Sequence, residues 1–247
     1  MNFARSLCMV LLLIGLPIGP TAANSPALRV GVLDDAPPLA FRDANGNLTG
    51  FSIKLAQALC AELNVRCEMI VTKLDYLVDD LAAGHFDLVA VGLLNTPERR
   101  QKIGFTKPVY RSVTLWFARA GIEPGQPGTR VAAFKGSAQE SYARTRGWDT
   151  VGAQTDVQII EQLTAGVAQA AIAPLMTTLS LQKDPRFLKL GLTPKVLQVP
   201  ELDGLACYGI NPRRADLKVP LDEAIEKIKR NGVYDRINSQ FLPFRVN

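Results

Sequence analysis

Residues 84–110 read GHFDLVAVGLLNTPERRQKIGFTKPVY and decide the fold. Phe86–Leu93 is nearly continuous in apolar residues, which is typical of a strand buried on both faces of a parallel sheet. Thr96 and Pro97 then supply an N-cap and a first helical residue. A helix that begins at the carboxyl end of a parallel strand points free N–H groups at the crevice where anions bind. Arg99 adds a guanidinium suited to clamping a carboxylate, or else pairs with a surface acid.

Strands and helices alternate on both sides of this stretch, and the pattern restarts after a glycine- and proline-rich loop at Gly121–Gly128. Two α/β units in tandem, followed by a return segment, predict two lobes with a discontinuous first lobe. Apolar runs predict strands at Leu28–Leu33, Cys67–Thr72, Val109–Ala118, Arg130–Phe134, Ala170–Ala173, Val196–Val199 and Leu205–Ile210. Helical spacing predicts helices at Ser52–Asn64, from Leu74 to Gly84, and at Ser137–Arg146, Ile159–Ala165, Thr177–Gln182, Leu217–Arg230 and Tyr234–Phe241.

A second helix start follows the expected strand Arg130–Phe134. Ser137 and Glu140 have the spacing of a capping box. Gly136 allows the backbone to approach a ligand closely, and Gln139 offers an amide. As a lone motif this is weak, because capping boxes occur in most proteins.

Composition excludes several function classes. The net charge is +5 and scattered, and its densest clusters are not interleaved with aromatic residues, so no nucleic-acid partner is expected. His85 is the single histidine and lies in a turn, with no HExxH or CxxC beside it, so no metal site is expected. GxSxG, phosphate-loop and GxGxxG motifs are also absent. We therefore expect no catalytic residues and no cofactor.

The first residues have the pattern of a secretory signal peptide. Arg5 is positive, Cys8–Ile18 is almost wholly apolar, and small residues end at Ala23. The apolar run is too short for a membrane span, which needs about 20 residues. We expect cleavage near Ala23, a periplasmic location and no membrane insertion.

Three cysteines remain after that cleavage. Cys60 and Cys67 form either a disulfide between a helix end and the next strand or two buried thiols. Cys207 lies in an apolar run and is interpreted as a small core residue.

Six segments, in sequence order, resemble the polar amino-acid-binding proteins of ABC importers, solute-binding family 3. They are LRVGVLDDAPPLAF, NGNLTGFSIKLAQALCAELNVRCE, GHFDLVAVGLLNTPERRQKIGFTKPVY, KGSAQESYA, LTAGVAQAAIA and NGVYDRINSQF. The likeness covers nearly the whole mature chain, and the ordered set is specific although no single piece is. LCAELNVRC is most similar to the histidine and lysine/arginine/ornithine-binding branch, where cysteines of this spacing form a disulfide.

The resemblance implies an α/β, two-lobed periplasmic-binding-protein (type II) fold, each lobe a central sheet flanked by helices. A ligand shifts the population toward a closed form by contacting both lobes. The resemblance also implies a monomer and a membrane permease of an ABC importer as partner. The expected boundaries are 1–23 for the signal peptide, 28–108 and 205–247 for lobe 1, 114–200 for lobe 2, and hinge crossings near Val109–Val113 and Pro200–Gly204.

Part of the family's ligand site is retained. Arg99 corresponds to the arginine that clamps the ligand carboxylate, and Gly92 falls where the family offers a backbone N–H. Thr96 keeps its place in the helix-start motif. In lobe 2, Ser137 and Gln139 match ligand-facing positions. The resemblance therefore implies a ligand with a carboxylate.

The ammonium half of an amino-acid site is largely missing. A buried ammonium without a charge partner costs on the order of several kcal/mol. We therefore expect a small carboxylate that lacks the amino group or carries an apolar or aromatic body, with an ordinary amino acid held by other contacts as the alternative. Asp34 or Asp35, one place along, could compensate. The family's acid after the second-lobe strand falls on Pro174, its hydroxyl past Gly92 on Leu94, its first acid on Leu33 and its aromatic on Ala36.

Two other functions stay open. A periplasmic accessory or sensor protein of another enzyme system would keep the fold without import. The fold also hosts a cyclohexadienyl dehydratase, whose chemistry needs a general acid in the cleft. The corresponding position is again near Pro174, which cannot donate a proton.

Overall fold

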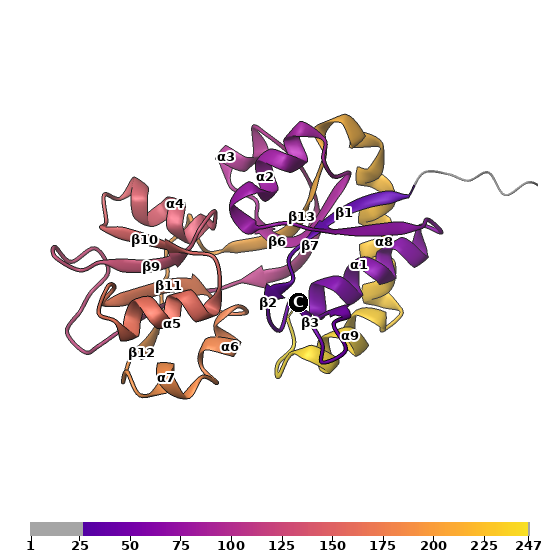
Figure 1. Cartoon of the computed structure of the whole chain (residues 1–247). Coiled ribbons are helices and arrows are strands. Elements are labelled where there is room, and N and C mark those ends of the chain that lie inside the picture. The colour runs from indigo at the N-terminus through magenta and orange to yellow at the C-terminus, as the bar shows by residue number, and fades with distance from the viewer. Residues whose placement is uncertain (1–26, 247) are drawn as a thin grey trace, which may run out of the picture.

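Two five-stranded sheets organise residues 27–246, the part of the chain that the computed structural model describes (Figure 1). Their strand orders are β5-β1-β6-β13-β7 and β10-β9-β11-β8-β12. Each sheet has its own helices, and the two halves lie side by side in Figure 1. The predicted α/β, two-lobed architecture is confirmed. The expected signal peptide, residues 1–23, lies outside the described residues.

The first sheet combines the N-terminal strands with one strand from late in the chain. β1 pairs in parallel with β5 and β6, whereas β13 runs antiparallel to both β6 and β7. β6 is buried because helices cover both faces of this sheet, as its continuous apolar run predicted. The strands are β1 (Leu28–Val32), β5 (Cys67–Val71), β6 (Leu88–Leu94), β7 (Gly104–Ser112) and β13 (Gly204–Ile210). The helices of this half are α1 (Phe51–Glu62), α2 (Leu74–Ala83), α3 (Pro97–Arg100), α8 (Lys218–Arg230) and α9 (Val233–Phe241), with a 3-10 turn at Pro212–Leu217.

A three-stranded hairpin sheet adjoins the first half. Asp43 stabilises the turn at Asn45 and Gly46, because its carboxylate accepts the backbone N–H groups of Asn45 and Asn47, each at 2.9 Å. This local carboxylate-to-backbone bonding is the usual way in which aspartate stabilises a turn. The strands are β2 (Asp35–Ala36), β3 (Ala40–Arg42) and β4 (Leu48–Thr49).

The second sheet is built from the middle of the chain. β9 lies between β10 and β11 and is parallel to both, and β8 runs antiparallel to β11 and β12. The strands are β8 (Thr114–Ala118), β9 (Val131–Phe134), β10 (Thr150–Ala153), β11 (Ala170–Pro174) and β12 (Thr193–Val196). The helices are α4 (Ala138–Thr145), α5 (Asp156–Thr164), α6 (Thr178–Leu181) and α7 (Pro185–Leu188).

Two strand predictions need correction, and one strand was not predicted. The strand expected at Val196–Val199 is wrong, because β12 is an exposed edge strand at Thr193–Val196 and the apolar residues after it pack on the core from a loop. The single extended run Val109–Ala118 is two strands in different sheets. β10 was missed because a half-buried edge strand containing glycine has no apolar run.

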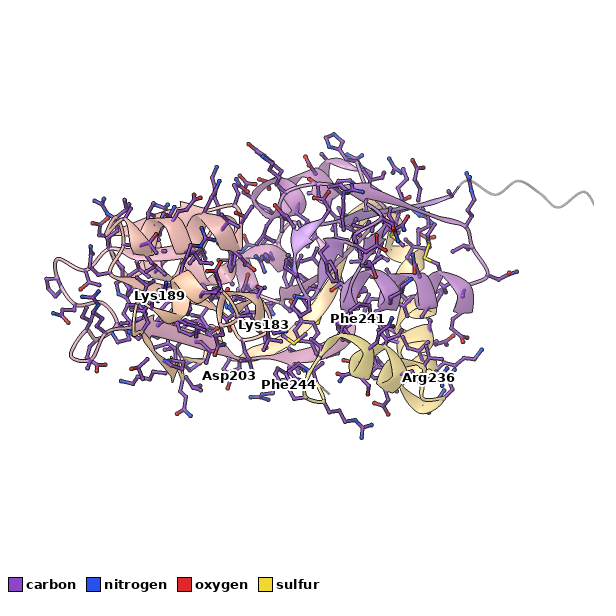
Figure 2. All side chains as sticks on the ribbon, turned by 60° about the horizontal axis from the view of Figure 1, so that its bottom comes forward. Lys183, Lys189, Asp203, Arg236, Phe241 and Phe244 are labelled. Atoms are coloured by element: carbon purple, nitrogen blue, oxygen red, sulfur yellow. A yellow bond between two sulfur atoms is a disulfide. The ribbon has the colours of Figure 1, made fainter. Side chains whose placement is uncertain are left out.

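The chain passes between the two sheets at two adjacent places. It leaves β7 at Ser112 and enters β8 at Thr114, and it returns through 200–204 into β13. The two passages lie together, because Gly204 pairs with Ser112 and the carboxylate of Asp203 binds Arg111 at 3.0 Å. Figure 2 labels Asp203 near the junction of the two halves.

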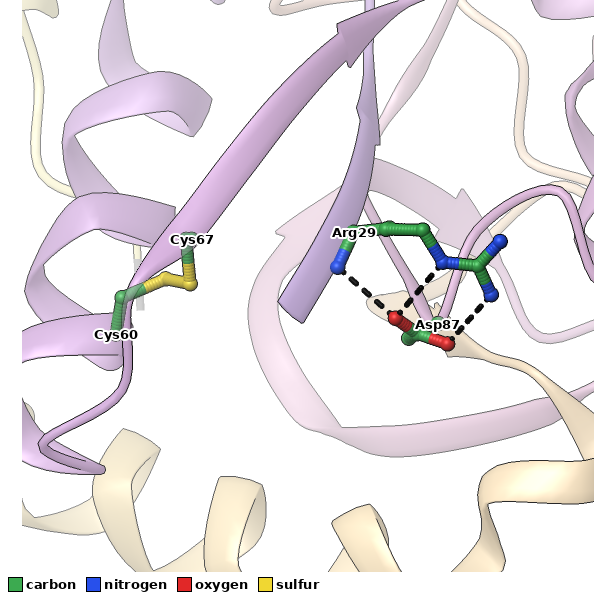
Figure 3. The surroundings of a disulfide bond; sticks show 4 residues. All are labelled: Arg29, Cys60, Cys67 and Asp87. Atoms are coloured by element: carbon green, nitrogen blue, oxygen red, sulfur yellow. Dashed lines mark hydrogen bonds and ion pairs between the residues drawn. A yellow bond between two sulfur atoms is a disulfide. The ribbon is translucent and has the colours of Figure 1, made fainter. Parts of the chain in front are cut away.

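A disulfide joins Cys60 at the end of α1 to Cys67 at the start of β5, with a Cα–Cα distance of 6.1 Å (Figure 3). This confirms the pairing that the family resemblance implied. Figure 3 also shows Arg29 bound to Asp87, which fixes β1 to the start of β6. Cys207 is buried in β13, and burial raises the pKa of its thiol to about 11. Its interpretation as a core residue is confirmed.

Candidate ligand-binding cleft

Two small enclosed chambers lie between the halves and share part of their walls. The first, the Arg99 chamber, has a volume of about 70 Å³ and contains Arg99, Gly92, Tyr110 and Gln139. The second, the Asp156 chamber, has a volume of about 60 Å³ and contains Asp156. Six residues line both: Leu33, Ala36, Leu74, Ser137, Pro174 and Thr177.

Arg99 projects from α3 and is only 9% exposed. Thr96 is the N-cap of this helix, as predicted, and its hydroxyl accepts the backbone N–H of Arg99 at 3.3 Å. The guanidinium donates to the carbonyl oxygens of Leu94 at 3.2 Å and of Gly136, in the other half, at 3.0 Å. It forms no ion pair with an acidic side chain of residues 27–246. Burial lowers the pKa of Arg99 to about 10, so the group stays cationic at neutral pH.

Gly92 lines the same chamber and lies directly against a tyrosine. A Cβ at Gly92 would come within 2.0 Å of the Tyr110 hydroxyl oxygen, so no larger residue fits without displacing that ring. Tyr110 is 4% exposed, and its hydroxyl makes no hydrogen bond to another of the described residues. Buried hydroxyls nearly always have a partner. Sequence reasoning missed Tyr110, because only the fold brings β7 beside β6 through β13.

The other half contributes the start of α4. Ser137 is the N-cap, and its hydroxyl accepts the N–H of Glu140 at 3.0 Å. The carboxylate of Glu140 accepts the N–H of Gly136 at 2.7 Å, one residue earlier than in an ordinary capping box. Gln139 is buried and donates to the hydroxyl of Thr114 at 2.9 Å. The structure thus brings Ser137 and Gln139 to the Arg99 chamber, although the amide of Gln139 also supports the inter-sheet passage.

Four of the residues singled out from the sequence form an apolar wall of the cavity. Leu33, Ala36 and Pro174 line both chambers, and Leu94 lines the Arg99 chamber. None of these side chains can accept a hydrogen bond from an ammonium. The four residues that the sequence singled out as replacements therefore do lie around the cavity.

The two aspartates suggested as compensation are placed differently. Asp34 lines neither chamber, and its carboxylate binds Arg42 at 2.8 Å. Asp35 lies at the rim of the Asp156 chamber, where partial burial and the charge of Asp34 raise its pKa. The structure therefore favours Asp35 over Asp34 as a residue of the cavity.

Asp156, which sequence reasoning missed, is the buried carboxylate of the second chamber. It is the first residue of α5, is 9% exposed, and hydrogen-bonds with the hydroxyl of Ser180. Burial raises the pKa of Asp156 to about 6. Thr155 is the N-cap of α5, and its hydroxyl accepts the N–H of Gln158. The helix therefore begins at Asp156, three residues before the predicted start at Ile159.

Direct contacts hold the two halves together beside the chambers. Asp75 of α2 binds Lys135 and Gln154 of the second half, each at 3.0 Å. Burial alone would raise the pKa of Asp75, but the hydrogen bonds from these two side chains lower it. Gly136, at φ +78°, lies so close that a Cβ there would come within 2.5 Å of the Asp75 Cα. The described structure is thus a closed arrangement of the two halves.

A wider groove of about 1080 Å³ opens next to Arg99, between α2, α3 and α4. Arg99 lines this groove too, and the other cationic side chains along it have acidic partners: Lys102 binds Asp79, Arg144 binds Glu140 and Arg146 binds Glu201. Among the described residues, the Arg99 chamber differs from the groove in also containing Tyr110, whose hydroxyl has no hydrogen-bond partner there, so this chamber is the candidate ligand site.

Within the described residues, no group of three or more metal-ligating side chains comes together, and no helix is long and apolar enough to cross a membrane.

Comparison with known proteins identifies the class. Residues 28–244 match the bacterial extracellular solute-binding proteins, family 3, and the chain belongs to that family. The lysine/arginine/ornithine-binding periplasmic protein of Escherichia coli K12 is 27% identical over 260 residues, covering 98% of both chains. The histidine-binding periplasmic protein of Salmonella typhimurium is 26% identical over 236 residues, covering 91% of both. These relatives are binding proteins and not enzymes.

The fold agrees with solved structures of the same kind. An ancestral arginine-binding protein bound to glutamine superposes with a TM-score of 0.75 at 24% identity, covering 87% of this chain and 97% of that one. This chain is therefore a non-enzymatic, two-lobed extracellular solute-binding protein.

Proposed function

We propose that this protein captures a small carboxylate between its two lobes and delivers it to the permease of an ABC importer. The observation that carries the proposal is the guanidinium of Arg99, 9% exposed and without an acidic partner among the described residues. A buried charge without a counter-ion is unfavourable unless a ligand supplies one. A carboxylate accepts two parallel hydrogen bonds from a guanidinium, which makes it the matching group.

The apolar wall narrows the ligand class. Leu33, Leu94 and Pro174 line the Arg99 chamber, and the family resemblance assigns their positions to the partners of an α-ammonium. Desolvating an ammonium against them costs on the order of several kcal/mol. The proposed ligand therefore has a carboxylate at Arg99 and no ammonium on the adjoining carbon. The named ligands of the relatives are α-amino acids, which form the competing class.

The lobes of the proposed closure follow the two sheets. Lobe 1 comprises 28–108 and 205–247, lobe 2 comprises 114–200, and the hinge lies in the two adjacent passages joined by Arg111 and Asp203. Support comes from the sheet composition, since all strands of the second sheet lie between Thr114 and Val196.

The place of action proposed for the chain is the periplasm, after cleavage near Ala23, as a monomer. The curated relatives are periplasmic proteins, and the first 23 residues have the composition of an export signal. The disulfide agrees with an oxidising compartment.

Isothermal titration with paired organic acids and α-amino acids tests the proposal. We expect binding of carboxylates without an α-amino group, and a loss of about a hundredfold or more in Arg99→Gln, because a buried charge-assisted pair is removed. Arg100→Gln is the matched control, since Arg100 is exposed and donates only to Asn95. Tight binding of an α-amino acid together with no binding of any organic acid would contradict the proposed ligand class.

A further inference from the structure

The cavity between the lobes has opposite charges at its two ends. Arg99 lines only one chamber, Asp35 and Asp156 line only the other, and the six shared residues separate them. Lys73 is the one cation that lines the Asp156 chamber, so two carboxylates there face one ammonium. A ligand that extends through both chambers meets a positive group first and a net negative environment at its far end.

The carboxylate of Asp156 has only weak compensation inside the protein. Its hydrogen-bond partner among the described side chains is the neutral hydroxyl of Ser180. The positive end of the α5 dipole stabilises the Asp156 carboxylate. The dipole would stabilise an exposed acid at this position equally well, so it does not account for the burial. Packing does not explain why Asp156 is buried, because no cation of the described residues forms an ion pair with it and a carboxylate is rarely buried without such a pair.

Unsatisfied groups in the Arg99 chamber point independently to a ligand. The guanidinium of Arg99 uses two of its five donors on carbonyl oxygens, and Tyr110, a residue that is 4% exposed, has a hydroxyl without a hydrogen-bond partner within the described residues. Both groups line the same chamber. A carboxylate there would accept from both.

We propose that the Asp156 chamber binds a cationic group at the far end of the ligand, so that the protein selects ω-amino or ω-guanidino carboxylates. The carboxylate lies at Arg99, an unbranched methylene chain passes the apolar wall of Leu33, Leu74 and Pro174, and the terminal cation reaches Asp156 and Asp35. This inference rests on the proposed function and adds the second pole of the ligand. It also explains how a site without partners for an α-ammonium selects a nitrogen-bearing ligand.

Titration calorimetry with length-matched pairs tests the inference. The probes are butanoate, pentanoate and hexanoate, each beside its ω-amino derivative, with 4-guanidinobutanoate added. For the length that spans both chambers, we expect the ω-cationic member to bind at least about tenfold more tightly, because it gains a charge-assisted hydrogen bond. In Asp156→Asn that advantage disappears, whereas the affinity for the plain carboxylate stays within about twofold.

Controls separate this inference from the function on which it rests. Glu161→Gln removes one negative charge from the same helix outside the cavity and keeps the advantage. Asp35→Asn, at the chamber rim, reduces the affinity advantage of the ω-cationic ligand. This variant replaces Asp156→Asn in the test if a thermal melt shows that Asp156→Asn does not fold. Equal affinity within every pair, or equal weakening of both members by Asp156→Asn, overturns the inference while the proposed function stands. Failure of every carboxylate to bind overturns both.

Discussion

Gly136 provides the sharpest test that the two lobes close on each other. Alanine at this position would put a Cβ within 2.5 Å of the Asp75 Cα and within 2.8 Å of the Asp75 nitrogen, both backbone atoms of the opposite lobe. Ordinary contacts are about 1 Å longer, so the closed lobes would have to separate by about that amount, which also stretches the contact from Arg99 to the Gly136 oxygen. Overpacking of this kind costs about 1–3 kcal/mol.

That strain exists only when the lobes are closed, so it reduces ligand affinity. A penalty of about 1–3 kcal/mol corresponds to about a 5- to 150-fold weaker Kd. Alanine in the left-handed conformation also lowers the free energy of unfolding by about 1–2 kcal/mol, and this cost is the same whether the lobes are open or closed. Gly147→Ala is the matched control. Gly136 lies just before α4 and Gly147 just after it, Gly147 has φ +74°, and a Cβ there meets nothing within 4 Å.

Calorimetry on both variants, with thermal unfolding alongside, separates the two effects. We expect similar losses of unfolding free energy, but weakened binding only in Gly136→Ala. Equal affinities for the two variants would refute the closed arrangement of Asp75 against Gly136.

Three further outcomes are expected. Replacing Cys60 and Cys67 together by serine lowers the free energy of unfolding by about 2–3 kcal/mol in urea titrations, because the unfolded chain gains freedom, and ligand affinity is unchanged; a serine variant as stable as the oxidised wild type would contradict the bridge. Asp156 has a folded-state pKa of about 6, above its unfolded value, so the folded protein holds the proton more tightly and stability without ligand falls as pH rises from about 4 to about 6. Asp156→Asn removes that decline and raises the free energy of unfolding at pH 7 by up to about 3 kcal/mol, whereas an unchanged pH profile would show that the carboxylate is not buried. Asp75→Ala removes the contacts to Lys135 and Gln154, and we expect about a 5- to 150-fold loss of ligand affinity by calorimetry, because the two bonds together add about 1–3 kcal/mol to closure; an unaltered Kd would show that these contacts do not hold the lobes.

The sequence predicted the fold well because the deciding signals are local. The apolar run of β6 and the N-cap at Thr96 each follow from a few adjacent residues. Edge strands escaped for the opposite reason: β10 and β12 are paired but not enclosed, so neither has the apolar pattern of a buried strand.

The candidate site was only partly predictable. Arg99 belongs to a helix-start motif that adjacent residues reveal. Tyr110 and Asp156 belong to no such motif. Tyr110 reaches Gly92 because β13 inserts between β6 and β7 from late in the chain, a pairing that no local pattern contains. In the sequence, Asp156 looks like an ordinary acidic residue in the first turn of a helix. Its burial becomes visible only when the two lobes are placed against each other.

Native mass spectrometry of the protein purified with its ligand shows whether Arg99 holds a carboxylate between the lobes. We expect a bound small molecule, released on denaturation, that carries a carboxylate and is missing from the Arg99→Gln variant prepared in parallel. A bound compound without a carboxylate, or the same occupancy in both preparations, would contradict this expectation.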